Sequence, residues 1–100
     1  MQLAKVRGTV VGTVKLEGLT GVKLLLLQYM DEQGDPLPNY EVAADLVGAG
    51  LGEWVLVSRG SAARQERNYQ ERPLDALIVA IIDTVTVDRR LLYSKKEQYR

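Results

Sequence analysis

The chain has 100 residues, of which 46% are hydrophobic and 26% are charged, and this composition predicts one folded domain with a single core. Thirteen basic residues balance 13 acidic ones, so the net charge favours neither a nucleic acid nor an anionic membrane as a partner. The sequence contains no cysteine and no histidine, which excludes disulfides, metal sites built on these residues and Ser-His-Asp catalysis, and the lack of cysteine fits a reducing cytoplasm.

The first half of the chain predicts three strands. Residues 3–14 alternate with period two and are interrupted by glycines, as in a curled strand, and a loop at residues 17–21 follows. The second strand is expected at residues 22–30. The stretch DEQGDPLP, residues 31–38, predicts a hairpin connection, because the spaced ligands and terminal Glu of a calcium-binding EF-hand are missing. The stretch YEVAAD, residues 40–45, predicts the third strand.

The second half predicts two more strands and a tail. Residues 53–58, EWVLVS, alternate as a fourth strand, and residues 60–68 predict a short helical turn with Ser61 as its N-cap. The longest strand is expected at residues 76–87. Residues 88–100 form a basic tail in which we expect a short extra strand and a solvated end. The sequence shows no export signal and no apolar run close to the roughly 20 residues that span a bilayer.

Five strands with one short helix predict an all-β fold, a small OB-like barrel over residues 1–87. Strands of such a barrel should alternate between inward apolar and outward polar residues, yet Leu24–Leu27 and Ala76–Ile82 are apolar on both faces. Each such side chain left in water would forfeit about 1.5–3 kcal/mol of burial. We therefore expect self-association, and Leu25 and Ile81 are the candidate interface residues, whichever of them faces outward.

The stretch VGAGLGEW, residues 47–54, places Gly48, Gly50 and Gly52 at alternate positions. A dinucleotide fingerprint requires G-x-G-x-x-G between a strand and a helix, whereas these glycines lead into a predicted strand. No helix N-terminus follows that could hold a phosphate. The spacing instead indicates positive φ angles or a close approach of two backbones, as at a contact with a neighbouring chain.

The remaining polar residues favour structural roles over catalysis. Asp45, Asp75 and Asp83 each lie near a strand end, where aspartate commonly caps a turn. Asp83 follows an apolar run and needs a partner, for which Arg59, Arg64 or backbone amides are the candidates. Both arginines are also candidates for a subunit contact or a pore, because six aromatic residues are few for a groove that binds single strands. We expect no metal, no cofactor and no enzymatic activity.

Three stretches carry a resemblance to a known family. AKVRGTVVGTVK at residues 4–15, DLVGAGLGEWVLVSRGSAAR at residues 45–64 and RPLDALIVAIIDTV at residues 72–85 resemble the CcmL/EutN family of bacterial microcompartment vertex proteins. Within the family, YEVAADLVGAG and SRGSAAR are most similar to the cyanobacterial carboxysome branch. We expect family patterns to diverge after Val87, so the resemblance implies nothing about the tail.

The resemblance implies a homopentamer of OB-like barrels that caps the vertices of a polyhedral shell in the cytoplasm. That shell would enclose carbonic anhydrase and ribulose bisphosphate carboxylase/oxygenase for photosynthetic carbon dioxide fixation, with hexameric shell proteins and internal scaffold proteins as partners. It also implies an axial pore, near which we place Gly48, Ala49 and Gly50. The alternatives are a vertex pentamer of another microcompartment and an OB-fold module that binds single-stranded nucleic acid.

Overall fold

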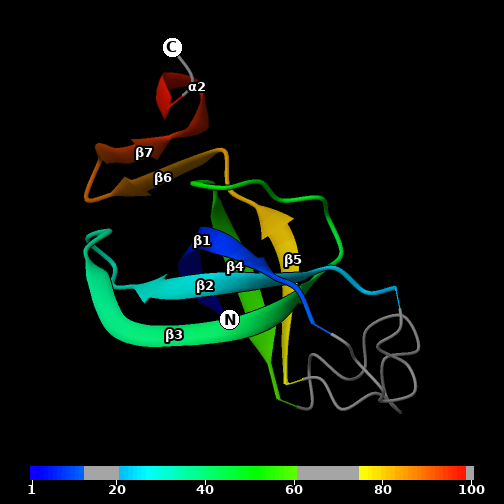
Figure 1. Ribbon diagram of the computed structural model, residues 1–100. Coiled ribbons are helices and arrows are strands. Elements are labelled where there is room, and N and C mark those ends of the chain that lie inside the picture. The colour runs from blue at the N-terminus through cyan, green and yellow to red at the C-terminus, as the bar shows by residue number, and fades with distance from the viewer. Residues whose placement is uncertain (13–20, 61–74, 99–100) are drawn as a thin grey trace.

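The computed structural model describes residues 1–12, 21–60 and 75–98 (Figure 1). Its elements are β1 (Gln2–Val10), β2 (Leu24–Met30), β3 (Pro36–Asp45), β4 (Trp54–Arg59), β5 (Ala76–Ile81), β6 (Thr84–Val87), β7 (Arg90–Ser94) and α2 (Lys95–Gln98). The described short helix is therefore α2, close to the C-terminus. From Ser61 onward, the predicted helical turn and the candidate Arg64 lie outside the described residues.

Five strands close into a barrel in the order β1-β2-β3-β5-β4, which confirms the predicted all-β, OB-like architecture. All neighbours are antiparallel except β3 and β5, which pair in parallel where Ala44 meets Leu77. The pairing of β1 with β2 shifts register between Val6 and Gly8. Such a bulge bends and twists a strand, as the closure of a small barrel requires.

The alternation of β2 decides which of its leucines reach the core. Leu25 and Leu27 are buried in the main core cluster, whereas Leu24 and Leu26 are partly exposed on the outer side of the barrel. Leu25 is only 1% exposed, and Ile81 packs against the same inner cluster. The expectation that Leu25 or Ile81 faces outward is wrong, because Leu25 on β2 and Ile81 on β5 both point to the inner side of the barrel.

Part of the apolar outer face is covered within the chain itself. Ala44 of β3 and Leu77 of β5 are fully buried in a second cluster, to which Leu24 and Val79 add partly buried side chains. This cluster explains why β2 and β5 are apolar on both faces. It also reduces the apolar area that self-association has to cover.

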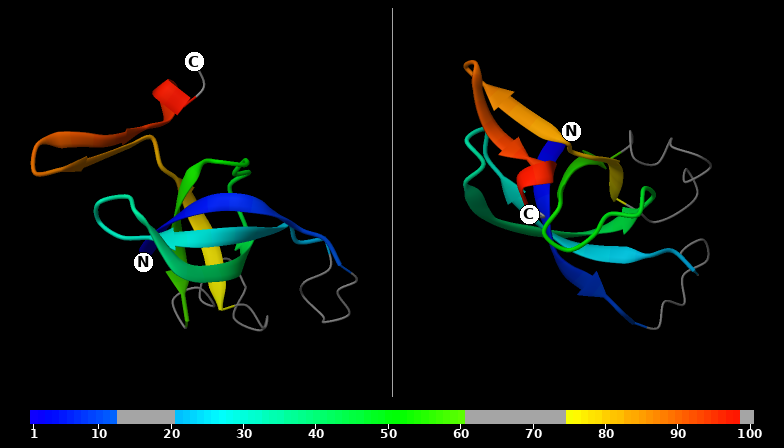
Figure 2. Two further views of the ribbon diagram at one scale, coloured as in Figure 1. Left: turned by 60° about the vertical axis from the view of Figure 1, so that its left-hand side comes forward. Right: turned by 90° about the horizontal axis from the view of Figure 1, so that it is seen from above.

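The predicted strand at residues 76–87 is wrong, because the chain leaves the barrel after Ile81. Residues Thr84–Val87 pair with Arg90–Ser94 in a separate two-stranded sheet. Asp88 and Arg89 form its turn with φ of 50° and 65°, the backbone conformation of a two-residue type I′ hairpin. The predicted boundary after Val87 thus falls inside a hairpin. We call β6, β7 and α2 the C-terminal arm, which projects beyond the barrel (Figures 1 and 2).

Candidate functional site

The glycine loop, residues 46–53, connects β3 to β4 and crosses one end of the barrel. It lies between the barrel and the C-terminal arm (Figures 1 and 2). Ala49 is buried in the main core cluster, so the loop inserts a methyl group into this end of the barrel. The loop therefore closes the barrel, and its backbone rather than the Ala49 side chain is available to any pore.

A carboxylate at the end of β3 sets the conformation of the first half of the loop. Asp45 Oδ1 accepts hydrogen bonds from the amides of Val47 and Gly48, each at 3.0 Å, and Oδ2 accepts one from Ala49 at 2.9 Å. The ammonium group of Lys23 lies 3.7 Å from Oδ2. The expected structural role of Asp45, the capping of a turn, is confirmed.

A second carboxylate sets the other half. Glu53 Oε1 accepts a 2.6 Å hydrogen bond from the amide of Gly50, and Oε2 lies 2.9 Å from Lys95 Nζ of the C-terminal arm. The side chain of Glu53 is only 9% exposed. Its hydrogen bond to Lys95 lowers the pKa of the carboxyl group; burial opposes this shift, and the Gly50 amide supports it. Glu53 is thus an ionised, nearly buried group shared by the loop and the arm.

The three glycines of the loop have separate reasons to be glycine. Gly48 and Gly52 adopt φ of 79° and 83°, which confirms the predicted need for positive φ. At Gly50 a Cβ atom would lie 3.2 Å from Glu53 Oε1, so the close approach is to a carboxylate. Leu51, which is 70% exposed, leaves an apolar side chain on the surface of this rigid loop.

Trp54, next to Glu53, attaches the C-terminal arm to the barrel. Its indole stacks on the ring of Tyr93, with centroids 4.2 Å apart and an interplanar angle of 16°. Gly34 lies against the edge of the same indole, where an added Cβ would be 2.7 Å from Trp54 and 3.4 Å from Leu92. Sequence analysis missed this contact. The available signal was the single tryptophan of the chain together with a tyrosine in the tail.

A polar cluster contains Tyr29, Glu41 and Arg59. Arg59 Nε lies 2.8 Å from Glu41 Oε1, and the Tyr29 hydroxyl donates a 2.9 Å hydrogen bond to the same oxygen. Burial, followed by this hydrogen bond, raises the pKa of Tyr29. Arg59 is therefore the partner of Glu41 and not of Asp83, which is exposed to water and needs no such partner.

An exposed apolar surface lies on the outer side of the barrel. Leu26 and Val42 are register partners on β2 and β3, and Tyr40 lies two residues before Val42 on the same side of β3. Val42 is 48% and Tyr40 is 56% exposed. We call Leu24, Leu26, Tyr40 and Val42 the outer β2–β3 face. The apolar outer surface that the sequence predicts therefore exists, but it is formed by these residues and not by Leu25 or Ile81.

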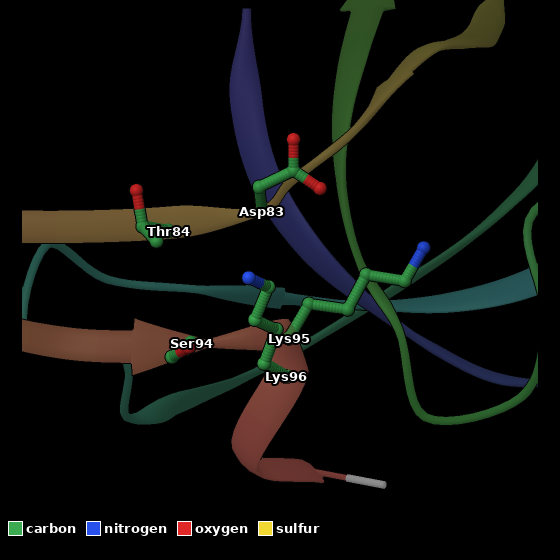
Figure 3. A pocket seen from close by; sticks show the side chains of 5 residues that line it. All are labelled: Asp83, Thr84, Ser94, Lys95 and Lys96. Atoms are coloured by element: carbon green, nitrogen blue, oxygen red, sulfur yellow. The ribbon is translucent and has the colours of Figure 1, made fainter.

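An open groove of about 660 Å³ runs beside the arm. Asp83 and Thr84 line it on the β6 side, and Ser94, Lys95 and Lys96 line it on the other (Figure 3). Within residues 1–12, 21–60 and 75–98, no three His, Cys, Asp or Glu side chains converge as metal ligands. No helix in the same ranges is long and apolar enough to span a membrane.

Three features are typical of a small β-barrel protein that assembles with other protein chains. They are the closed barrel, the glycine loop held by two carboxylates, and the exposed apolar outer β2–β3 face. The family described as ethanolamine utilisation protein EutN/carboxysome matches residues 1–83. The chain belongs to this family.

Relatives match over the full length, so the similarity runs past the predicted limit at Val87 and through the tail. The chain is 65% identical to the carboxysome shell vertex protein CcmL of Gloeobacter violaceus, over 100% of both chains. It is 41% identical to the microcompartment shell vertex protein EutN of Salmonella typhimurium, over 95% of this chain and 96% of that one.

Solved structures agree with these relatives. The structure of Gloeobacter violaceus CcmL superimposes with a TM-score of 0.90 at 64% identity, covering 96% of this chain and 99% of that one. The pentameric microcompartment shell protein GrpN of Rhodospirillum rubrum superimposes with a TM-score of 0.79 at 47% identity, covering 87% and 99%. The predicted family is confirmed.

Proposed function

We propose that this chain is a structural subunit of the carboxysome shell, which assembles into a ring of five and closes the shell at its vertices. The observation that carries the proposal is full-length identity of 61–66% to proteins named carboxysome shell vertex protein. Relatives named EutN are 41% identical, which gives the vertex of another microcompartment less support.

The proposed mechanism is geometric. A sheet of hexagonal units closes into a polyhedron only when pentagons are inserted, so a ring of five at each corner supplies the curvature. Hexameric shell proteins are the proposed neighbours, internal scaffold proteins are further partners, and the shell lies in the cytoplasm. The enclosed carbonic anhydrase and carboxylase carry out the chemistry, and this chain turns over no substrate.

A ring requires two different patches on each subunit, because each contact joins one patch to the other patch on the next copy. The outer β2–β3 face supplies one candidate patch, with Val42 at its centre. The tip of the glycine loop, with Leu51, supplies the other. A loop held by two carboxylates presents its apolar tip at little entropic cost, which favours a specific contact.

Near the ring axis we place the backbone at Gly48, Gly50 and Gly52. Ala49 contributes only its peptide groups there, because its side chain is in the core. Arg59 remains a candidate for a subunit contact, since its side chain is about half exposed although it is paired with Glu41.

The ring is tested by native mass spectrometry of the purified full chain, with Val42→Asp as the variant and Val42→Thr as its shape-matched control. We expect pentamers for the natural chain and for Val42→Thr, and subunits of unchanged secondary structure for Val42→Asp. Burying one uncompensated carboxylate per contact is costly enough to separate the ring. A natural chain that is monomeric at micromolar concentration would refute the proposed ring. Pentameric Val42→Asp would exclude the outer β2–β3 face from the contact.

The vertex role has its own test. Mixed with hexameric carboxysome shell proteins in vitro, the natural chain should convert flat sheets or open tubes into closed polyhedra visible by electron microscopy. Sheets that stay open in its presence would contradict the role.

A further inference from the structure

Glu53 is the only described side chain that joins the glycine loop to the C-terminal arm through both of its oxygens. Oε1 holds the Gly50 amide at 2.6 Å, and Oε2 holds Lys95 Nζ at 2.9 Å. Both contacts use the same rigid carboxylate group. A displacement of Lys95 therefore moves the carboxylate that accepts the hydrogen bond of the Gly50 amide.

Burial makes the two contacts dependent on each other. With the Glu53 side chain 9% exposed, the charge is stabilised mainly by the amide and the ammonium group rather than by water. When the ammonium is withdrawn, the carboxylate gains most by turning toward solvent. That rotation removes the acceptor from Gly50.

The arm can transmit a displacement because, among the described residues, its strands pack more extensively on each other than on any barrel strand. The described contacts include the ion pair of Lys95, the stack of Tyr93 on Trp54, the packing of Leu92 beside Gly34 and, at the base of the arm, a 2.9 Å hydrogen bond from the Ile82 amide to the Trp54 carbonyl. A two-stranded sheet is marginally stable by itself, so its position depends on these contacts. Glu53 and Trp54 are neighbours in sequence, and the same strand end therefore carries both attachments.

We propose that Glu53 is a positioning residue that couples the C-terminal arm to the glycine loop, so that a contact made by the arm alters the order of the loop. Its role in the shell rests on the proposed function, in which the loop lies near the ring axis and the arm projects from the barrel. A displacement of the arm by neighbouring shell proteins would then alter the order of the loop through the Glu53 carboxylate.

The test is amide hydrogen exchange on the full chain, read at Gly50 and across the arm by nuclear magnetic resonance. Lys95→Met should accelerate exchange at Gly50 by about tenfold, the effect of losing one hydrogen bond to a charged acceptor. Lys96→Met removes the same charge from the next, exposed residue of α2 and should leave Gly50 unchanged. Lys95→Arg keeps the charge and should restore most of the protection.

Coupling must also act in the reverse direction, because linkage between two sites is reciprocal. Gly50→Ala places a Cβ 3.2 Å from Glu53 Oε1 and should accelerate exchange in β7 and at Lys95. Gly48→Ala is the matched control. It strains the loop at φ 79° but meets no atom within 4 Å, so it should leave the arm protected.

Unchanged exchange at Gly50 in Lys95→Met, or unchanged exchange in the arm in Gly50→Ala, would overturn the coupling. Native mass spectrometry of the same samples separates this result from the proposed function. A pentamer without coupling refutes only the inference, and a monomer with coupling refutes only the ring.

Discussion

Removing the Asp45 carboxylate tests whether the glycine loop is held by local hydrogen bonds to one side chain. Asp45→Ala deletes the acceptor of three amides, those of Val47, Gly48 and Ala49. The first two amides are exposed and regain water, at about 0.5 kcal/mol each. The Ala49 amide is partly buried and costs about 1.5 kcal/mol when it is left without a partner. The expected loss of unfolding free energy is about 2.5 kcal/mol.

Urea denaturation at fixed protomer concentration measures this loss, since the stability of an assembling chain depends on its concentration. With an m-value of about 1.3 kcal/mol per molar urea, the midpoint should fall by about 2 M. Asp45→Asn keeps the acceptor for two amides and should lose about half as much. Lys23→Met should lose less, about 0.5–1 kcal/mol, because the Lys23 side chain is half exposed and its ammonium lies 3.7 Å from the carboxylate, although the Asp45 side chain is only 1% exposed.

The reasoning fails if Lys23→Met costs as much as Asp45→Ala. That result would mean that Asp45 acts through its ion pair, at 3.7 Å, and not through the backbone of the loop. An Asp45→Ala midpoint within 0.4 M of the natural chain, about 0.5 kcal/mol, would show that water replaces all three hydrogen bonds.

Three further predictions concern the attachments around the barrel. Gly34→Ala should lower the unfolding free energy by about 2 kcal/mol in thermal melts, because its Cβ would lie 2.7 Å from Trp54 at φ 82°; an unchanged melting temperature would contradict the tight packing. The lowered pKa of Glu53 adds stability above its ordinary value of 4.5 that is lost as the pH falls through the folded value, so Glu53→Gln should flatten the acid limb of a stability–pH curve. The raised pKa of Tyr29 means that stability falls as the pH rises above its ordinary value of 10.0, and Tyr29→Phe, which loses its hydrogen bond to Glu41, should lack this loss in alkaline denaturation.

Local patterns were sufficient to predict the barrel. Period-two alternation identified the barrel strands, and the spacing of Gly48 and Gly52 identified two residues with positive φ. The capping role of Asp45 was also predictable, because an aspartate two to four residues before loop amides commonly accepts their hydrogen bonds. All these features depend on residues close together in the chain.

The orientation of β2 could not be read from its sequence. Four consecutive leucines fit either phase of a strand, and a shift of one residue exchanges the inner and outer faces. The structure fixes the phase through Tyr29, which follows on the inner side, and through the register shift at Gly8 of β1. For this reason the sequence could not show that Leu25, one of the two candidates for an outward residue, faces the core.

The short extra strand expected in the tail is confirmed by β7, but the arm as a separate sheet was missed because its cause lies far away in the sequence. The residues from Thr84 to Val87 have the composition of a continued barrel strand, and Asp83 is the one local signal for a break after Ile81. The break is fixed by contacts with the end of the chain, where the Lys95 amide donates to the Asp83 carbonyl at 2.8 Å.

The two carboxylates of the glycine loop show the same division between local and distant causes. Every hydrogen bond that Asp45 accepts comes from the four residues after it, so its capping role follows from the sequence, although its ion partner Lys23, 3.7 Å away, is distant in the chain. Glu53 accepts one local amide, from Gly50, but its charge is compensated by Lys95 near the C-terminus. A carboxylate with only the local bond would lie in a nearly buried position without a cation. Residues that bind one local and one distant partner are therefore where a loop can respond to the rest of the protein.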